Sequence, residues 1–232
     1  GISLADRFAD CNIVLSEKNG GYGSGVNLGV MSSEKSEIYI ITNPDTDFTN
    51  TKLKNLLDAF DRDDELGVLG MNLLYPDGRQ QYSARTFYTW SIVLLRRSVL
   101  GKLPWLRACV DRHLMKDMWR FPEFDADWVL GTGFAVRRTA FEEAGGMDEG
   151  YFMYFEDVDL CARLRIGGWR VRATSSVTLI HNHGRDSASG LFSKMQKIHI
   201  KSLFRFAKKF GMPIFGSPKI GRMKSKSNSF QH

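Results

Sequence analysis

The alternation of apolar, strand-like segments with segments of helical periodicity constrains the fold of this chain more than any other feature. Strands are predicted over residues 12–16, 37–42, 67–74, 129–136 and 169–173, and a strand or extended segment over residues 81–87. Helices are predicted over residues 26–33, 51–60, 138–144 and 158–166. Residues 89–118, rich in Arg, Leu and Trp, follow neither pattern and leave room for a helical excursion. Strands that alternate with helices indicate an α/β sheet covered on both faces, with ligands at the carboxyl ends of the strands.

The composition predicts one globular domain in a reducing compartment. The 232 residues are 43% hydrophobic, which is enough to bury a sizeable core without linkers or repeats. Cys11, Cys109 and Cys161 lie far apart without CxxC spacing, so neither a zinc knuckle nor a disulfide framework is indicated. The longest apolar runs fall far short of the roughly 20 residues that span a bilayer, and no signal peptide is expected. We therefore expect a cytoplasmic protein.

The net charge of +6 is unevenly distributed. Residues 187–232 hold ten Lys and Arg and no acid, whereas residues 1–186 hold 22 basic and 26 acidic groups. Apolar residues recur among these charges at helical spacing, namely Leu191, Met195, Ile198, Leu203, Phe206 and Phe210. Such a helix binds an anionic membrane, where each basic residue contributes about 1 kcal/mol, or packs its apolar face on the rest of the protein, and the two are compatible. No nucleic-acid module accompanies the charge, so no nucleic-acid partner is expected.

Residues 150–160, with the sequence GYFMYFEDVDL, place acidic groups against aromatic side chains. Glu156 and Asp157 lie at the centre of this segment. Burial beside aromatic rings and a neighbouring like charge both raise the pKa of a carboxyl, as a general base near neutral pH requires. The other interpretation is a helix start, in which Phe155 leads into an acidic first turn that suits the helix dipole.

The flanking motifs favour the catalytic interpretation. They are GTG at 131–133, a basic pair at 137–138, GGMD at 145–148, GGW at 167–169, NGGYGSGVNLGV at 19–30 and IYIITNPDTDF at 38–48. In this order they resemble the family 2 glycosyltransferases, the inverting nucleotide-sugar enzymes of the GT-A fold. The resemblance covers residues 19–210 and is closest to bacterial rhamnosyltransferases of O-antigen and related cell-surface polysaccharide synthesis.

The resemblance implies roles for residues around the acidic pair. Asp157 would remove the proton of the acceptor hydroxyl, and Glu156 would hold the geometry or electrostatics of the site. Asp127, Trp128 and Gly133 would line the cleft for sugar and acceptor, where Trp128 offers a flat apolar face to a pyranose ring.

The polar segment 43–47 follows an apolar strand and resembles the aspartate motif of the family. By resemblance Asn43 takes the place of the first aspartate, Asp45 is the metal ligand, and Asp47 is a less certain second ligand. The cofactor would be Mn²⁺ or Mg²⁺, which neutralises a diphosphate leaving group. A Pro-Asp turn that closes a strand is the alternative.

The motif HNHG places His181 and His183 on the same side of an extended segment. By resemblance one of them completes the metal shell, while a structural role is the alternative. Arg185 is a candidate ligand of the diphosphate, because an arginine fork fits phosphate oxygens.

The glycine-rich segment 19–27 gives backbone amides close access to a ligand ahead of a helix. The resemblance makes it a loop that shapes the nucleotide pocket, with Asn19, Gly23 and Asn27 near the donor. A plain turn is the alternative.

Family members begin with a strand, a helix and a second strand that carries an acidic motif for the base and ribose. This unit, roughly 40–60 residues, is expected to be missing ahead of Gly1. The expected organisation is a GT-A type, Rossmann-like mixed sheet over residues 1–186, truncated at its amino end, and a basic amphipathic helix with its tail over residues 187–232.

The function predicted by resemblance is metal-dependent, inverting transfer of a sugar. The donor would be dTDP-L-rhamnose, the acceptor a polyprenyl-diphosphate-linked saccharide, and the location the inner face of the cytoplasmic membrane. The alternative is a catalytically inactive fragment that binds saccharide or membrane.

Overall fold

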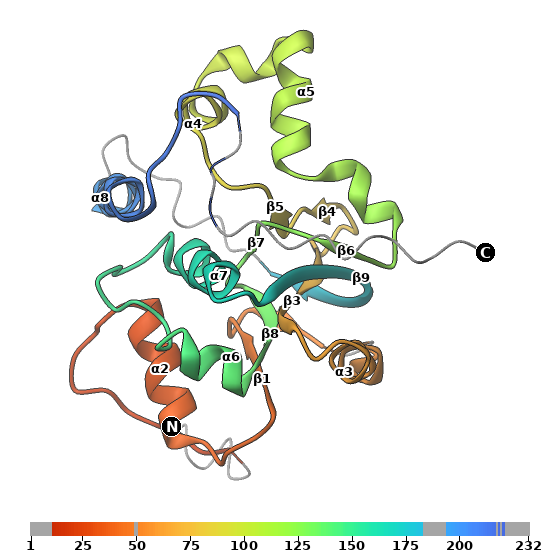
Figure 1. Cartoon of the computed structure of the whole chain (residues 1–232), viewed down its shortest axis with the longest axis vertical. Coiled ribbons are helices and arrows are strands. Elements are labelled where there is room, and N and C mark those ends of the chain that lie inside the picture. Colours follow the sequence, from red (N-terminus) through yellow and green to blue (C-terminus); the bar gives the residue numbers. More distant parts are fainter. Residues whose placement is uncertain (1–10, 49–50, 183–193, 217, 219, 221–232) are drawn as a thin grey trace.

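A mixed β-sheet forms the centre of the protein in a computed structural model that describes residues 11–48, 51–182, 194–216, 218 and 220 (Figure 1). Its strands are β1 (Ile38–Thr42), β2 (Thr46–Asp47), β3 (Leu66–Leu74), β4 (Gln80–Gln81), β6 (Glu123–Asp125), β8 (Gly133–Arg137) and β9 (Arg170–His181). The order is β1-β8-β3-β9-β2, while β4 pairs with β3 and β6 pairs with β9. Only β3 and β9 pair in parallel within the described sheet. A separate antiparallel pair consists of β5 (Ala84–Arg85) and β7 (Trp128–Val129).

Helices cover both faces of the sheet, as the alternating pattern predicted. They are α2 (Tyr22–Ser32), α3 (Leu53–Arg62), α4 (Trp90–Arg97), α5 (Pro104–His113), α6 (Arg138–Glu143), α7 (Glu156–Ile166) and α8 (Lys194–Phe210). On one face Leu56 and Phe60 of α3 pack with Leu69 and Leu179 of the sheet. Figure 1 shows α6 and α7 on the opposite face, where a second apolar cluster forms. The α/β class is therefore confirmed.

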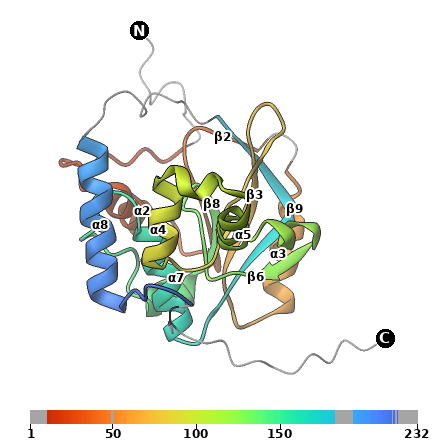
Figure 2. The same ribbon diagram turned by 90° about the horizontal axis from the view of Figure 1, so that it is seen from above.

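The segment without a clear pattern forms the expected helical excursion. It contains α4, the 3₁₀ helix η1 (Val99–Lys102), α5 and the 3₁₀ helix η2 (Lys116–Arg120). Thr89 caps α4, because its hydroxyl accepts a hydrogen bond from the backbone N–H of Ile92 at 3.2 Å. Figure 2 shows α8 beside α4, where the rings of Trp90 and Phe204 lie 5.9 Å apart.

Helix α8 packs its apolar face on the rest of the protein, as one interpretation of the basic helix predicted. Leu203 and Phe206 are buried. Lys209 bridges Asp148 at 2.8 Å and the buried Asp159 at 2.7 Å. No helix in the described part of the chain combines the length and apolar content needed to cross a bilayer. The expected division of the chain after residue 186 stays a prediction.

Four element predictions were wrong or incomplete. Residues 12–16 are not a strand; they are exposed and pair with no described strand. Helix α2 begins at Tyr22 and includes two glycines that were assigned to the preceding turn. Strand β9 continues to His181, because β3 and β2 pair with it beyond its polar middle. The segment 129–136 is divided between β7 and β8 by a break at residues 130–132.

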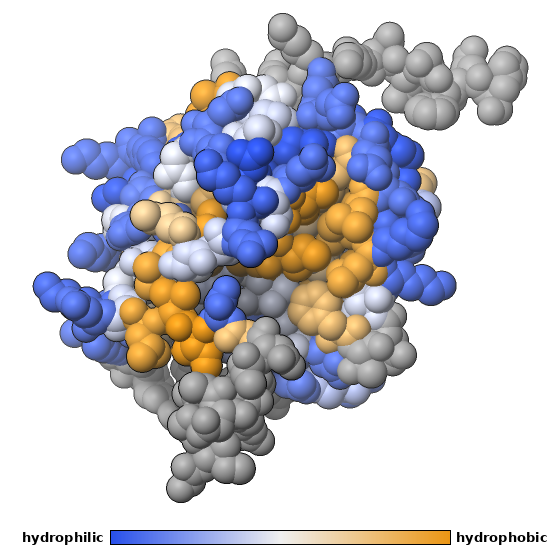
Figure 3. Space-filling view, turned by 90° about the horizontal axis from the view of Figure 1, so that it is seen from below, coloured by the Kyte–Doolittle hydropathy of each residue, from blue (hydrophilic) through white to orange (hydrophobic). Residues whose placement is uncertain are grey.

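The edge strand β1 borders an apolar groove. Among the described strands only β8 pairs with it. Between β1 and α2 lies a groove of about 770 Å³, lined by Val26, Val30, Ile38 and Ile40 among others. Figure 3 shows apolar surface gathered around a hollow on this side of the molecule.

Candidate active site

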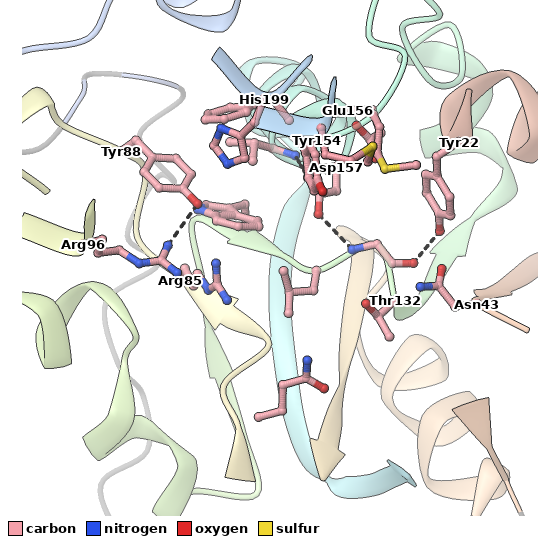
Figure 4. Close-up of a pocket in the computed structure, with 18 of the residues that line it drawn as sticks. Tyr22, Asn43, Arg85, Tyr88, Arg96, Thr132, Tyr154, Glu156, Asp157 and His199 are labelled. Atoms are coloured by element: carbon pink, nitrogen blue, oxygen red, sulfur yellow. Dashed lines mark hydrogen bonds between the residues drawn. The ribbon is translucent and has the colours of Figure 1, made fainter. Parts of the chain in front are cut away.

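A cavity of about 750 Å³ lies where the carboxyl end of β1 meets the first turn of α7 (Figure 4). The register of the sheet creates this meeting point. Thr42 pairs with Gly133, so the residues after β1 lie beside the residues before β8. The backbone N–H of Asn43 donates to the carbonyl of Thr132 at 3.0 Å. The cavity is therefore at the end of the sheet where the sequence predicted the site.

Asp157 occupies the middle of the cavity. Its Oδ2 accepts a hydrogen bond from the backbone N–H of Gly131 at 2.9 Å, and its Oδ1 accepts one from Val158 at 2.8 Å. The hydroxyl of Tyr22 donates to the carbonyl of Gly131, so both peptide groups that flank this glycine are held. In Figure 4, Asp157 lies between Tyr88 on one side and Tyr22 on the other. The carboxylate is thus fixed and exposed to the cavity.

Glu156 and Asp157 have unequal environments, although burial raises the pKa of both carboxyls. Two backbone N–H groups and Arg85 stabilise the ionised form of Asp157. Glu156 is only 6% exposed, its pKa is raised further by the charge on Asp157, and its Oε2 has no hydrogen-bond partner among the described residues. Asp157 therefore ionises first and Glu156 keeps its proton, which makes Asp157 the better base.

The backbone before this pair is strained. Tyr154 and Phe155 both have φ of 69°, a left-handed conformation that costs of order 1–3 kcal/mol per residue. Helix α8 holds them in place. Phe155 packs on the ring of Phe206 at 5.6 Å, and Ser202 donates to the carbonyl of Met153 at 2.9 Å. Packing from the end of the chain thus directs the acidic turn into the cavity.

Asp45 and His181 meet at the opposite end of the cavity from Tyr88. In the sheet Thr46 pairs with His181, which brings Oδ2 of Asp45 to 3.2 Å from Nε2 of His181. Nδ1 of His181 lies 2.8 Å from Oε1 of Gln81. With Nδ1 as donor to Gln81, Nε2 presents its lone pair toward Asp45. Oδ1 of Asp45 is shielded from solvent and has no hydrogen-bond partner among the described residues.

The other predicted metal ligands are not placed beside Asp45 and His181 in the described structure. Asp47 lies in β2 opposite Ile180 and is not among the residues that line the cavity. His183 and Arg185 lie outside the described residues. Within the described part of the chain, no three His, Cys, Asp or Glu side chains are grouped to hold a metal ion.

Of the predicted sugar-binding residues, only Trp128 lines the cavity. Its indole N–H donates to the carbonyl of Thr86 at 2.9 Å. The carboxylate of Asp127 instead accepts from the backbone N–H of Phe87 at 2.9 Å and pairs with Arg165 at 3.3 Å. Asp127 therefore positions the backbone that carries the cavity wall.

Asn19, Gly23, Asn27 and Gly133 do not line the cavity either. Because α2 starts at Tyr22, Gly23 and Asn27 are helical and face the loop before α7. The side-chain amide of Asn27 donates to the carbonyl of Met147 at 3.0 Å and accepts from its N–H at 2.8 Å. Gly133 provides close packing, because a Cβ there would lie 2.7 Å from a leucine of β9. These residues support the site from outside.

The sequence prediction missed several residues of the cavity wall. They are Tyr22, Gln81, Arg85, Tyr88, Arg96, Arg97 and His199. The only signal for them was the Arg-rich composition of residues 89–118 and the tyrosine within the glycine-rich segment.

Comparison with known proteins identifies the family of this chain. No family model matches the chain. The N-acetylglucosaminyl-diphospho-decaprenol L-rhamnosyltransferase of Mycobacterium tuberculosis is 34% identical over 219 residues, which cover 85% of this chain and 68% of that enzyme. The chain belongs to the rhamnosyltransferase-like family 2 glycosyltransferases.

Two further similarities apply to this glycosyltransferase. The rhamnosyltransferase WbbL of Escherichia coli is 42% identical over 80 residues, which cover 34% of this glycosyltransferase and 30% of WbbL. The crystal structure of GalNAc-T7 with UDP, GalNAc and Mn²⁺ matches with a TM-score of 0.56 at 14% identity, covering 83% of this glycosyltransferase and 35% of that chain. The second likeness shows the GT-A fold.

Proposed function

We propose that this glycosyltransferase transfers an L-rhamnosyl group from dTDP-L-rhamnose, with inversion, to a saccharide carried on a polyprenyl diphosphate. The observation that carries the proposal is the Asp157 carboxylate, held by two backbone N–H groups in the middle of the cavity. The choice of sugar and acceptor is supported by the name of the mycobacterial relative, an N-acetylglucosaminyl-diphospho-decaprenol L-rhamnosyltransferase.

In the proposed reaction, Asp157 takes the proton of an acceptor hydroxyl while the hydroxyl oxygen attacks the anomeric carbon. The bond from that carbon to the diphosphate oxygen breaks, and its electron pair leaves with the nucleoside diphosphate. Attack on the face opposite the leaving group inverts the anomeric configuration. Glu156 stays protonated and so leaves the charge of the pair on Asp157.

Asp45 and His181 suit a divalent cation. Oδ1 of Asp45 has no hydrogen-bond partner among the described residues, and Oδ2 faces Nε2 of His181. A carboxylate is an ordinary ligand of Mn²⁺ and of Mg²⁺, whereas an imidazole nitrogen suits a transition-metal ion such as Mn²⁺ better than Mg²⁺. The diphosphate of the donor would supply further oxygens. A bound ion would neutralise charge on the leaving group. Asn43 lines the same end of the cavity and is the proposed neighbour of the donor.

We further propose that the protein lies on the inner face of the cytoplasmic membrane. Helix α8 exposes Ile200 and Phe204 among lysines. The connection after α4 exposes Val99, and the first turn of α5 exposes Trp105. Apolar insertion and attraction of basic side chains to anionic lipids act together at such a surface. An enzyme held there meets a lipid-linked acceptor without a search through the cytoplasm.

Transfer by the full-length protein from a panel of dTDP-, UDP- and GDP-sugars tests the proposal. The acceptor is N-acetylglucosaminyl diphosphate on a short polyprenol, and NMR of the product gives the anomeric configuration. We expect turnover with dTDP-L-rhamnose and an inverted linkage. Binding of saccharide without transfer from any donor would instead support a catalytically inactive saccharide-binding protein.

A further inference from the structure

Three arginines line the wall of the cavity. Arg85 comes from β5, and Arg96 and Arg97 come from the last turn of α4. Figure 4 shows Arg85 and Arg96 beside Tyr88, with Asp157 between them and Asn43. We call Arg85, Arg96 and Arg97 the arginine cluster.

The arginine cluster has no acidic partner within hydrogen-bond distance among the described residues. Arg96 donates to the hydroxyl of Tyr88 at 3.2 Å, and Arg97 lies 2.8 Å from Nδ1 of His199. The guanidinium of Arg85 stacks 5.1 Å from the ring of Trp128, and its Nε is buried without a hydrogen-bond partner. Guanidinium groups in a protein wall are normally paired with carboxylates, so these three are available to an anionic ligand.

The histidines beside the cluster do not add charge. Burial, with the charges of Arg96 and Arg85, lowers the pKa of His113 to about 3. Burial, Arg97 and Arg96 likewise lower the pKa of His199 to about 4. Both imidazoles are neutral at pH 7 and can accept hydrogen bonds, which orient the guanidinium groups without neutralising them.

We infer that the arginine cluster binds the diphosphate of the acceptor. The inference rests on the proposed function and adds a binding site to it. Figure 4 shows Asp157 between Arg85 and Arg96 on one side and Asn43 on the other. Asp45 follows Asn43 by two residues and meets His181 in the cavity wall. A donor diphosphate at Asp45 and an acceptor diphosphate at the arginines would therefore place the reacting sugars together at the base. Arginine forks match phosphate oxygens in pairs, and a cluster of three can hold two adjacent phosphates.

Kinetics with two acceptors that differ only in the diphosphate test this site. One is N-acetylglucosaminyl diphosphate on a short polyprenol, and the other is an alkyl N-acetylglucosaminide without phosphate. For Arg96→Gln and Arg97→Gln we expect KM for the first acceptor to rise about 10- to 100-fold. KM for dTDP-L-rhamnose and for the neutral acceptor should change less than about threefold.

Matched variants separate charge from structure. Arg107→Gln removes an exposed arginine of α5 that pairs with Asp111 at 3.8 Å, and it should behave as the wild type. Arg96→Lys should recover part of the affinity for the diphosphate acceptor, because it restores the charge but not the fork. Equal losses with both acceptors would overturn the inference, since they would show that the arginines only maintain the cavity wall.

A binding measurement, which needs no turnover, tests whether the arginine cluster binds the diphosphate of the acceptor or that of the donor. Inorganic pyrophosphate is titrated by calorimetry into the full-length protein with its donor site saturated by dTDP. Pyrophosphate should bind the wild type and bind Arg96→Gln at least about 10-fold more weakly. If Arg96→Gln weakens dTDP instead, the cluster belongs to the donor and the inference is wrong. Arginine-dependent pyrophosphate binding by a protein that transfers no sugar would refute the proposed function and leave the anion site standing.

Discussion

Replacing Asp157 by asparagine removes the proposed base and keeps the shape of the side chain. Its two carboxylate oxygens each accept one backbone hydrogen bond, from Gly131 at 2.9 Å and from Val158 at 2.8 Å. An amide has only one acceptor oxygen, so one of these N–H groups would face the NH₂ group. An unpaired buried N–H costs about 1–3 kcal/mol. Loss of the charge beside Glu156 offsets part of this cost, so the folded protein should persist.

Turnover is expected to fall much further than stability. A positioned general base contributes about 10²–10⁴ in rate, or about 3–5 kcal/mol of transition-state stabilisation. Donor binding should be retained, because Asn43 and Asp45 at the other end of the cavity are unchanged. The assay is the initial rate of rhamnosyl transfer, with dTDP affinity measured by calorimetry. Asp77→Asn in an exposed turn is the matched control.

Two results would refute this reasoning about Asp157. Near-normal turnover in a variant that melts normally would remove Asp157 from the role of base. A loss of turnover matched by an equal loss of dTDP affinity would place Asp157 in the donor site instead.

Three further outcomes follow from the same structure. Glu156→Gln should lower turnover less than Asp157→Asn. It should also leave the rising limb of the pH–rate profile in place, because the amide resembles a protonated carboxyl. A shift of that limb by more than about one pH unit would show that Glu156 ionises first. A chelator should abolish transfer, and added Mn²⁺ or Mg²⁺ should restore it in the wild type but not in Asp45→Ala. His181→Ala should need a higher metal concentration for the same rate. Full activity in the presence of chelator would exclude a metal ion from the reaction. Phe204→Ser on α8 should weaken co-sedimentation with anionic liposomes, which high salt should also weaken. Undiminished binding, or equal binding to neutral vesicles, would contradict membrane contact through α8.

The sequence predicted those parts of the fold that local patterns determine. Strand β1 follows from its apolar run, and α7 follows from its acidic first turn and its terminal Gly167. A histidine beside Asp45 was also expected, but only from the family resemblance, which did not choose between His181 and His183. Local patterns predicted these elements because each is short and its partners do not change its type.

The break at residues 130–132 could not be predicted in the same way. The apolar run from Val129 to Val136 is compatible with one strand, and the break depends on hydrogen bonds that Gly131 makes with Tyr22 and Asp157. The arginine cluster was missed for a similar reason. The sequence of α4, an apolar run that ends in two arginines, does not reveal whether these charges will find an acidic partner, and Arg96 finds none among the described residues.

The order of strands in the sheet has a consequence for synthesis of the chain. Strand β3 lies between β8 and β9, which the ribosome makes much later, and almost all of β3 is buried in the finished protein. During translation most of β3 is therefore an apolar strand with open edges, since β4 pairs only with its last two residues, and such a strand is a template for association with other nascent chains. Strand β9 must emerge before β3 is covered, and α8 must follow before Phe155 is packed. Slow initiation, low temperature or a bound chaperone should raise the soluble yield of this protein more than any change that stabilises its folded state.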